Sequence, residues 1–114
     1  MQVVTVAIPI EEIQDWPTFH DVFQRVMSFP SFYGRNMDAW IDCMTSLDSP
    51  EDGMTTVNVD RGGLLGMELD KTTEFERRCP EQYRALLDCT GFVNFRRRQA
   101  GDAPVLAVLL IGSK

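Results

Sequence analysis

The chain has 114 residues, of which 44% are hydrophobic and 25% are charged, as is ordinary for one globular domain. Its formal net charge is −6 and is unevenly spread, because residues 1–60 carry ten acids against two arginines. Nucleic-acid binding requires cations that neutralise phosphates, so this composition disfavours a direct nucleic-acid role and favours a basic protein partner.

The sequence offers little sign of a membrane segment, a secretory signal or a metal site. No apolar run approaches the roughly 20 residues of a membrane span, and the first residues lack the basic region of a secretory signal. The three cysteines, Cys43, Cys79 and Cys89, are odd in number and lack the spacing of metal ligands. We therefore expect a cytoplasmic protein with reduced thiols, no metal and no cofactor.

The first part of the chain predicts a strand followed by a helix. Residues 3–8 are β-branched and apolar on both faces, which is typical of a buried strand in a parallel sheet. A helix is expected to begin near Asp15, with Pro17 in its first turn, where the missing N–H costs nothing. His20 lies off the apolar face of this helix, so we expect an exposed histidine and not a catalytic base. The apolar face consists of Phe19, Val22, Phe23, Val26 and Met27.

Residues 29–44 predict a turn that leads into a second, short helix. Asn36 suits the N-cap position, and Gly34 supplies a permissive backbone before it. Asp38 and Asp42 stand one helical turn apart and off the apolar stripe, so both are expected to face solvent. The stripe itself follows the i, i+3, i+4, i+7 pattern and consists of Met37, Trp40, Ile41, Met44 and Leu47.

The two carboxylates are unfavourable for the helix by itself. Like charges four residues apart cost an isolated helix about 0.2–0.5 kcal/mol. Asp38 recovers a comparable amount from the helix dipole, whereas Asp42 lies too far from the N-terminus to do so. Two interpretations stay open on local physics: a solvated helix face that tolerates one poor residue, or a pair of carboxylates directed at a positive group.

The middle of the chain is less clear. Weak alternation in residues 55–59 predicts the second strand. Residues 64–69 remain open between a helical turn, an extended edge and a packed loop. Thr72 or Thr73 is expected to cap a short helix that ends at Arg78.

The last third predicts a long helical region and a final strand. Pro80 marks a helix start, and poor helix formers around Gly91 suggest a kink or break. The three arginines at 96–98 fit a helix C-terminus better than a nucleic-acid site in an acidic chain. Residues 105–111 are almost wholly apolar and predict the best-buried strand. We expect the following residues of the helical region to pack in the core: Tyr83, Leu86, Leu87, Phe92, Val93 and Phe95.

Residues 32–43, Phe-Tyr-Gly-x-Asn-Met-Asp-Ala-x-x-Asp-Cys, resemble the signature of the barstar family, intracellular inhibitors of the ribonuclease barnase. Strands separated by helices already imply an α/β fold with a mostly parallel sheet. The resemblance implies its specific form: one small domain, residues 1–114, with a three-stranded parallel sheet packed with helices. No paired nucleophile and base and no split carboxylate pair is legible, so we do not expect an enzyme.

The resemblance also implies a site and a partner. Asp42 matches the principal carboxylate that stands in for a substrate phosphate, and Asp38 matches the second one. The implied partner is a basic ribonuclease or nuclease toxin, with the free chain a monomer; the alternative is a barstar-like interaction or regulatory module with another partner. The further partner-binding positions implied are Phe32, Tyr33, Gly34, Asn36, Ile41 and Thr45.

Overall fold

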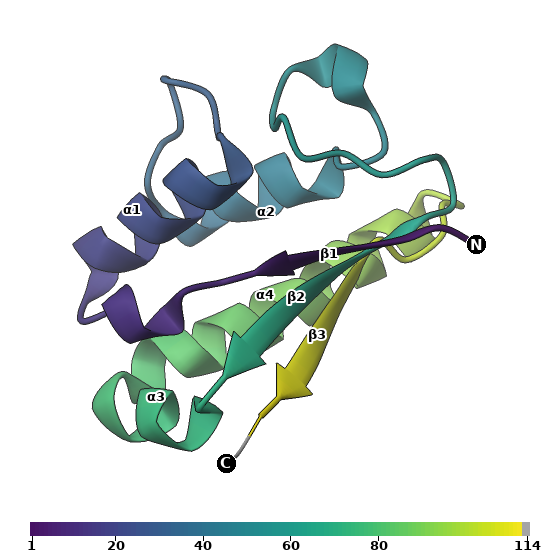
Figure 1. Cartoon of the computed structure of the whole chain (residues 1–114). Helices are drawn as coiled ribbons and strands as arrows, with labels where there is room; N and C mark the ends of the chain where they lie inside the picture. The colour runs from purple at the N-terminus through teal and green to yellow at the C-terminus, as the bar shows by residue number, and fades with distance from the viewer. Residues whose placement is uncertain (113–114) are drawn as a thin grey trace.

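Three parallel strands form the sheet of the structure, a computed structural model that describes residues 1–112 (Figure 1). The strands lie in the order β1–β2–β3, so β2 is central. The predicted fold class is confirmed. The strands are β1 (Val3–Ala7), β2 (Leu64–Asp70) and β3 (Leu106–Ile111). The α-helices are α1 (Trp16–Met27), α2 (Met37–Thr45), α3 (Thr72–Arg78) and α4 (Pro80–Gln99), and the short 3₁₀ helices are η1 (Ile10–Glu12) and η2 (Pro50–Asp52).

The central strand is the segment that the sequence left open. Leu65, Met67 and Leu69 of β2 are fully buried against the helices. Val4 and Val6 of β1 pair with the first two of these residues and complete that face. The buried centre of this sheet is therefore built from residues 64–70.

The first and last predicted strands are confirmed, but the predicted strand at 55–59 and the predicted burial of the other two were wrong. Residues 55–59 form no strand; the backbone N–H groups of Thr56 and Val59 donate to the carbonyls of Met27, the last residue of α1, and of Leu47, two residues after α2. Residues 106–111 form an edge strand whose last two side chains are exposed, and not the best-buried strand. Residues 3–7 alternate between exposed and half-buried side chains, because helices cover only one face of this edge strand.

The helices largely follow their predicted caps. The Asp15 side chain accepts the Thr18 backbone N–H at 3.0 Å, and the Thr18 hydroxyl bonds back to Asp15, which forms a capping box at the start of α1. The residue before α3 is Lys71, in a left-handed conformation, so neither Thr72 nor Thr73 is its cap.

Helix α4 runs without a break from Pro80 to Gln99, so the break predicted near Gly91 is absent. The neighbouring Thr90 is buried, and its hydroxyl donates to the Leu86 carbonyl one turn earlier, at 2.7 Å. Packing of this inner side of α4 outweighs the poor helix propensity of the segment. Figure 1 shows α4 behind the sheet, with α1 and α2 beside the β1 edge.

Candidate partner-binding surface

Helix α2 begins at a well-formed cap. The Asn36 side-chain oxygen accepts the Ala39 backbone N–H at 2.8 Å, and the backbone at Asn36 is extended. The side-chain amide of Asn36 also donates to the Gly34 carbonyl at 3.3 Å. The predicted N-cap is therefore confirmed, and it places Asp38 in the first turn, where the helix dipole stabilises a carboxylate.

The two aspartates of α2 face solvent, as predicted. Trp40 and Met44 of the apolar stripe are fully buried, whereas Asp38 and Asp42 are exposed. The Asp42 side chain is 60% exposed. A helix fixed to the core on one side thus presents the carboxylates of Asp38 and Asp42 on the other, and we call this exposed side the α2 surface.

The loop before α2 combines an exposed ring with a buried one. Phe32 is 73% exposed, whereas the adjacent Tyr33 is buried and packs against Phe29. The Tyr33 hydroxyl hydrogen-bonds His20 Nδ1 at 2.6 Å. Phe32 therefore projects from a loop that is anchored to α1. A hollow of about 140 Å³ joins this loop to α2 and is lined by Phe32, Tyr33, Gly34, Ala39, Asp42, Cys43 and Met54.

His20 is buried, so the expectation of an exposed histidine was wrong. Its ring stacks on Trp16 and bonds Tyr33, which lies thirteen residues further along the chain. Burial lowers the pKa of His20, and the nearby Arg35 cation lowers it further. The imidazole is therefore kept neutral as a structural support of the Phe32 loop.

This burial predicts an acid-sensitive loop support. A histidine pKa below its ordinary value of 6.5 means that the unfolded chain binds the proton more tightly. The contribution of His20 to stability is therefore complete above that pH and falls as the pH drops below it. Urea unfolding measured between pH 5 and 7.5 should show this loss in the wild type and a flatter profile in His20→Gln. Identical pH profiles for the two proteins would contradict the prediction.

Arg35 does not lie against the aspartate pair. Its guanidinium donates to Asp21 at 2.7 Å, to Gln24 at 3.0 Å and to the Pro17 carbonyl at 3.0 Å, all on α1. Asp21 offsets its positive charge, and the side chain fastens the loop to α1. Arg35 precedes Asp38 by only three residues, but its charge is directed at α1 and therefore offsets the negative charge of Asp38 and Asp42 only weakly.

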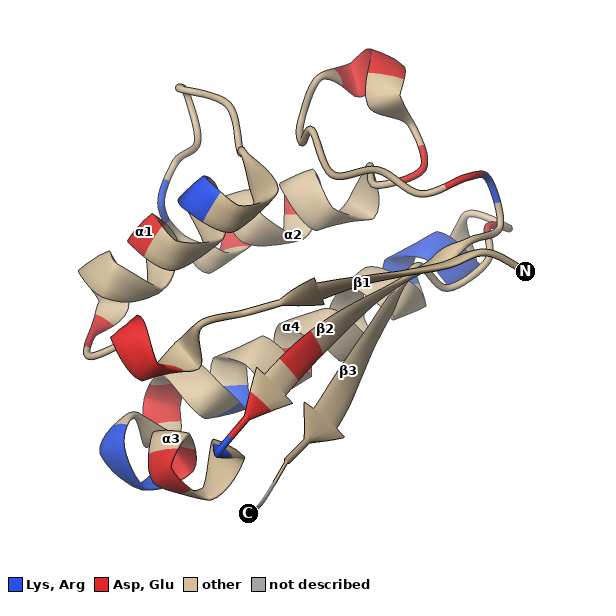
Figure 2. Cartoon of the chain, in the orientation of Figure 1, with Lys and Arg blue, Asp and Glu red and all other residues tan. Residues whose placement is uncertain are grey.

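Arg96 of α4 reaches Asp42, a contact that no sequence pattern indicates. One guanidinium nitrogen lies 3.2 Å from Asp42 Oδ1, and the two side chains are 44% and 60% exposed. Figure 2 shows the acids of α2 and η2 and the arginines at the end of α4. The pair borders an open hollow of about 470 Å³ lined by Asp42, Thr45, Ser46, Asp52, Met54 and Arg96.

This exposed pair should contribute little to folding. Solvent-exposed ion pairs typically contribute about 0–1 kcal/mol, because water screens them and the side chains lose freedom. A double-mutant cycle with Asp42→Ala and Arg96→Ala, followed by urea unfolding, should give a coupling free energy below ~1 kcal/mol. A coupling of several kcal/mol would show instead that the pair is a structural element of the fold.

The next arginine has a different environment. Arg97 is paired bidentately with Asp48, at 3.0 and 2.8 Å, and the two side chains are only 6% and 8% exposed. Arg97 also donates to the carbonyls of Thr45 and Ala103. Hydrogen bonds from Arg97 hold the pKa of Asp48 below its ordinary value. These contacts fix the end of α4 to the end of α2, while Arg98 remains exposed.

Two aromatic side chains of α4 are exposed. Phe92 and Phe95 stack on each other and are about half exposed, so the expectation that they pack in the core was wrong. Leu87 is likewise exposed, because the inner side of α4 is set by Leu86 and Val93. Phe92 stands four residues before Arg96, which places it on the side of α4 that borders α2.

The predicted site residues fall into two groups. Phe32, Gly34, Asn36, Asp38 and Asp42 are exposed, and Thr45 is half-buried at the edge of the larger hollow. Tyr33 and Ile41 are buried beneath them. Within residues 1–112 there is no group of side chains suited to hold a metal ion, and no helix of this part of the chain is long and apolar enough to cross a membrane.

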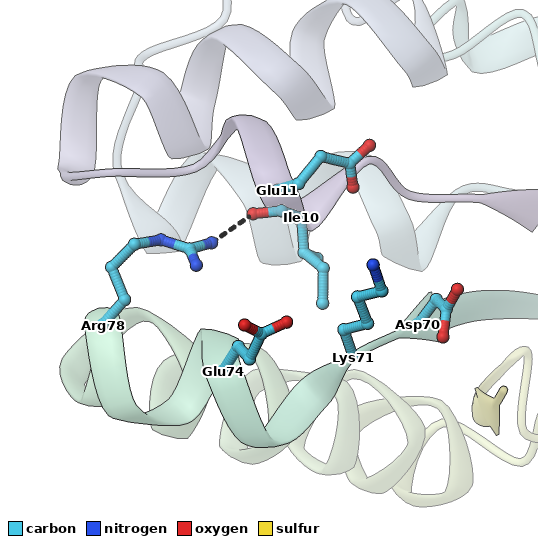
Figure 3. Close-up of a pocket in the computed structure, with 6 residues that line it drawn as sticks. All are labelled: Ile10, Glu11, Asp70, Lys71, Glu74 and Arg78. Atoms are coloured by element: carbon cyan, nitrogen blue, oxygen red, sulfur yellow. Dashed lines mark hydrogen bonds between the residues drawn. The ribbon is translucent and has the colours of Figure 1, made fainter. Parts of the chain in front are cut away.

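A separate hollow lies at the carboxyl ends of β1 and β2 (Figure 3). Its volume is about 360 Å³, and acids and bases alternate around it. The Arg78 guanidinium there donates to the Ile10 carbonyl at 2.9 Å, which joins α3 to η1. The lining residues, Ile10, Glu11, Asp70, Lys71, Glu74 and Arg78, include none of the α2 surface.

Comparison with known proteins identifies a family over most of the chain. The sequence matches the family described as Barstar (barnase inhibitor) over residues 3–108. A search among curated proteins found no match. The matched range contains all three strands except the end of β3, all four α-helices and the complete α2 surface. The chain therefore belongs to the barstar family.

Proposed function

We propose that this protein inhibits a barnase-like ribonuclease or nuclease toxin by placing the Asp38 and Asp42 carboxylates where the enzyme binds substrate phosphates. The observation that carries the proposal is the helix α2 itself. It is capped by Asn36 and buried along its apolar side, yet both carboxylates remain exposed. Membership of a family described as barnase inhibitors supports the same function.

The mechanism requires no chemistry from the inhibitor. A ribonuclease site holds cations that bind phosphate and stabilise negative charge during the reaction. A carboxylate can accept two parallel hydrogen bonds from one arginine, and such charged bonds are about twice as strong as neutral ones. Among residues 1–112, Asp42 bonds Arg96 through Oδ1 only, so Oδ2 remains available to a partner cation. Occupation of the site then excludes RNA.

The other proposed site residues divide between contact and support. Phe32 would contact the enzyme through its exposed ring, and Gly34 through its backbone. Tyr33 and Ile41 are buried and would act by holding the loop and helix in place. Thr45 lies at the rim, where its hydroxyl donates to the Ile41 carbonyl at 2.6 Å. Pre-organisation of this kind reduces the entropy lost on binding.

The surrounding charge favours fast association. Glu51 and Asp52 of η2 add exposed carboxylates near the α2 surface, and Asp52 shares the larger hollow with Asp42. Such a field raises the encounter rate with a basic protein and weakens with salt. We expect the free chain to be a monomer that acts in the cytoplasm, where an inhibitor protects cellular RNA.

The test is the hydrolysis of RNA by purified barnase, titrated with this protein. Inhibition that is complete at a one-to-one ratio is the expected result. Calorimetry, which measures binding directly and does not depend on RNA hydrolysis, should detect the same complex. Full activity of barnase and of related secreted ribonucleases at excess inhibitor would refute the proposal for this enzyme class.

The alternative is an interaction module with a partner other than a nuclease. The exposed, stacked pair Phe92 and Phe95 favours this candidate, because such rings are common anchors of protein interfaces. A partner whose binding is lost in Phe92→Ser/Phe95→Ser but kept in Asp38→Asn/Asp42→Asn would support it. The opposite pattern would assign the partner to the α2 carboxylates.

A further inference from the structure

We propose that Arg96 is a specificity-determining residue, which weakens the attraction of Asp42 for a purely cationic nuclease site and so restricts the range of nucleases inhibited. This inference rests on the proposed function. Its basis is that the strongest candidate for the phosphate-mimicking carboxylate already has a cation of its own chain at 3.2 Å.

The backbone of Arg96 is held close to α2. Its neighbour Arg97 is held by Asp48 and by the Thr45 carbonyl, so the last turn of α4 is fastened to the end of α2. From that backbone position the Arg96 side chain lines the same hollow as Asp42. Its charge lies 3.2 Å from Asp42, well within the Debye length of about 8 Å at physiological salt, so it acts on a cation that approaches Asp42.

A nuclease that covers this corner meets a mixed site. If the nuclease leaves Arg96 paired with Asp42, fewer acceptor positions remain for the nuclease cation. If it displaces the Arg96 guanidinium, it must provide another acceptor for that group. A site made only of arginine and lysine offers no such acceptor, and like charges placed together oppose binding. Arg96 therefore weakens binding to a purely cationic site, but it does not weaken binding to a site that has an acceptor beside its cation. Repulsion of one class of partner in this way produces specificity.

The chain contains a matched control for this idea. Arg98 is exposed like Arg96, lies on the same helical turn, and makes no side-chain hydrogen bond or ion pair within residues 1–112. Arg96→Glu and Arg98→Glu change the net charge equally. A difference between them therefore reports the position of Arg96 beside Asp42 and not the overall field.

The experiment compares barnase binding by the wild type, Arg96→Gln, Arg96→Glu, Arg98→Glu and the double variant Asp42→Asn/Arg96→Glu, at about 0.15 M salt, where exposed distant charges are screened. We expect Arg96→Glu to tighten binding about tenfold more than Arg98→Glu, as removal of one close like-charge contact predicts. Arg96→Gln should give a smaller increase in affinity, and the increase should be absent in the double variant.

The outcomes separate this inference from the proposed function. Equal effects of Arg96→Glu and Arg98→Glu, or weaker binding by Arg96→Glu, would overturn the role of Arg96 even if the wild type inhibits barnase through Asp42. No binding by the wild type but Asp42-dependent binding by Arg96→Glu would support that role and exclude barnase as the natural target. No binding by either protein would overturn it, because the unmasked carboxylates should then attract the cationic site.

Discussion

Asp42→Ala is expected to weaken the complex with an inhibited ribonuclease by more than ~2 kcal/mol, the general threshold for an interface hot spot. This threshold is a general value for protein interfaces, and the barnase–barstar pair is one of the systems that illustrate it. The physical reason is that truncation removes a carboxylate from a buried charge pair and leaves the partner cation without its acceptor. The measurement is the dissociation constant for barnase by calorimetry or by titrated inhibition.

A suitable control is Glu76→Ala. Glu76 is an exposed acid on α3, outside the α2 surface, and its removal changes the net charge by the same amount. Its loss should slow association slightly at low salt and leave dissociation almost unchanged, whereas Asp42→Ala should act mainly by faster dissociation. Equal dissociation constants for Asp42→Ala and the wild type would remove Asp42 from the proposed mechanism.

Asp48→Ala is expected to destabilise the fold by about 3–5 kcal/mol, the usual cost of removing one member of a buried ion pair. The truncation leaves the Arg97 guanidinium, which is 6% exposed, without its carboxylate. Because Arg97 joins the end of α4 to the end of α2, the loss should also loosen the α2 surface. The change in the free energy of unfolding is measured in urea.

The exposed pair serves as the comparison for this prediction. Arg96→Ala should cost below ~1 kcal/mol in the same assay, because that residue pairs with Asp42 in solvent. Replacement of both buried partners, in Asp48→Leu/Arg97→Met, should recover much of the stability lost in Asp48→Ala, since no buried charge then remains unpaired. A loss below 1 kcal/mol for Asp48→Ala would show that the pair is dispensable.

The buried pair also predicts an acid limit for stability. The pKa of Asp48 is lower in the fold than its ordinary value of 3.8, chiefly because Arg97 donates hydrogen bonds to it. The unfolded chain therefore takes up the proton first as the pH falls. The stabilising contribution is complete above pH 3.8 and is lost as the pH falls through the lower pKa of the folded protein.

Local chemistry in the sequence determined the presentation of the two carboxylates. Asn36 caps α2 because its side chain can reach an N–H only three residues away, and helical spacing turns Trp40 inward and Asp42 outward. Asp15 and Pro17 determine the start of α1 in the same way. Such interactions span one turn of chain, so a sequence pattern is sufficient to predict them.

Only the tertiary structure decided which segment became the central strand. Residues 55–59 and 64–69 both suit an extended conformation, but only the second pairs with strands on each side. The backbone of the first bonds to carbonyls near the ends of α1 and α2. Strand pairing depends on partners that are 61 residues away in β1 and 41 residues away in β3, so local propensity cannot rank the two segments.

The same limit applies to the three consecutive arginines of α4. In sequence they share one role at a helix C-terminus, yet Arg96 pairs with Asp42 in solvent, Arg97 is buried with Asp48, and Arg98 is exposed. Successive helical residues point about 100° apart, and their environments depend on what packs against each side. The sequence by itself determined a capped helix with two outward carboxylates; the packing of α4 against α2 decided that a cation stands beside one of them.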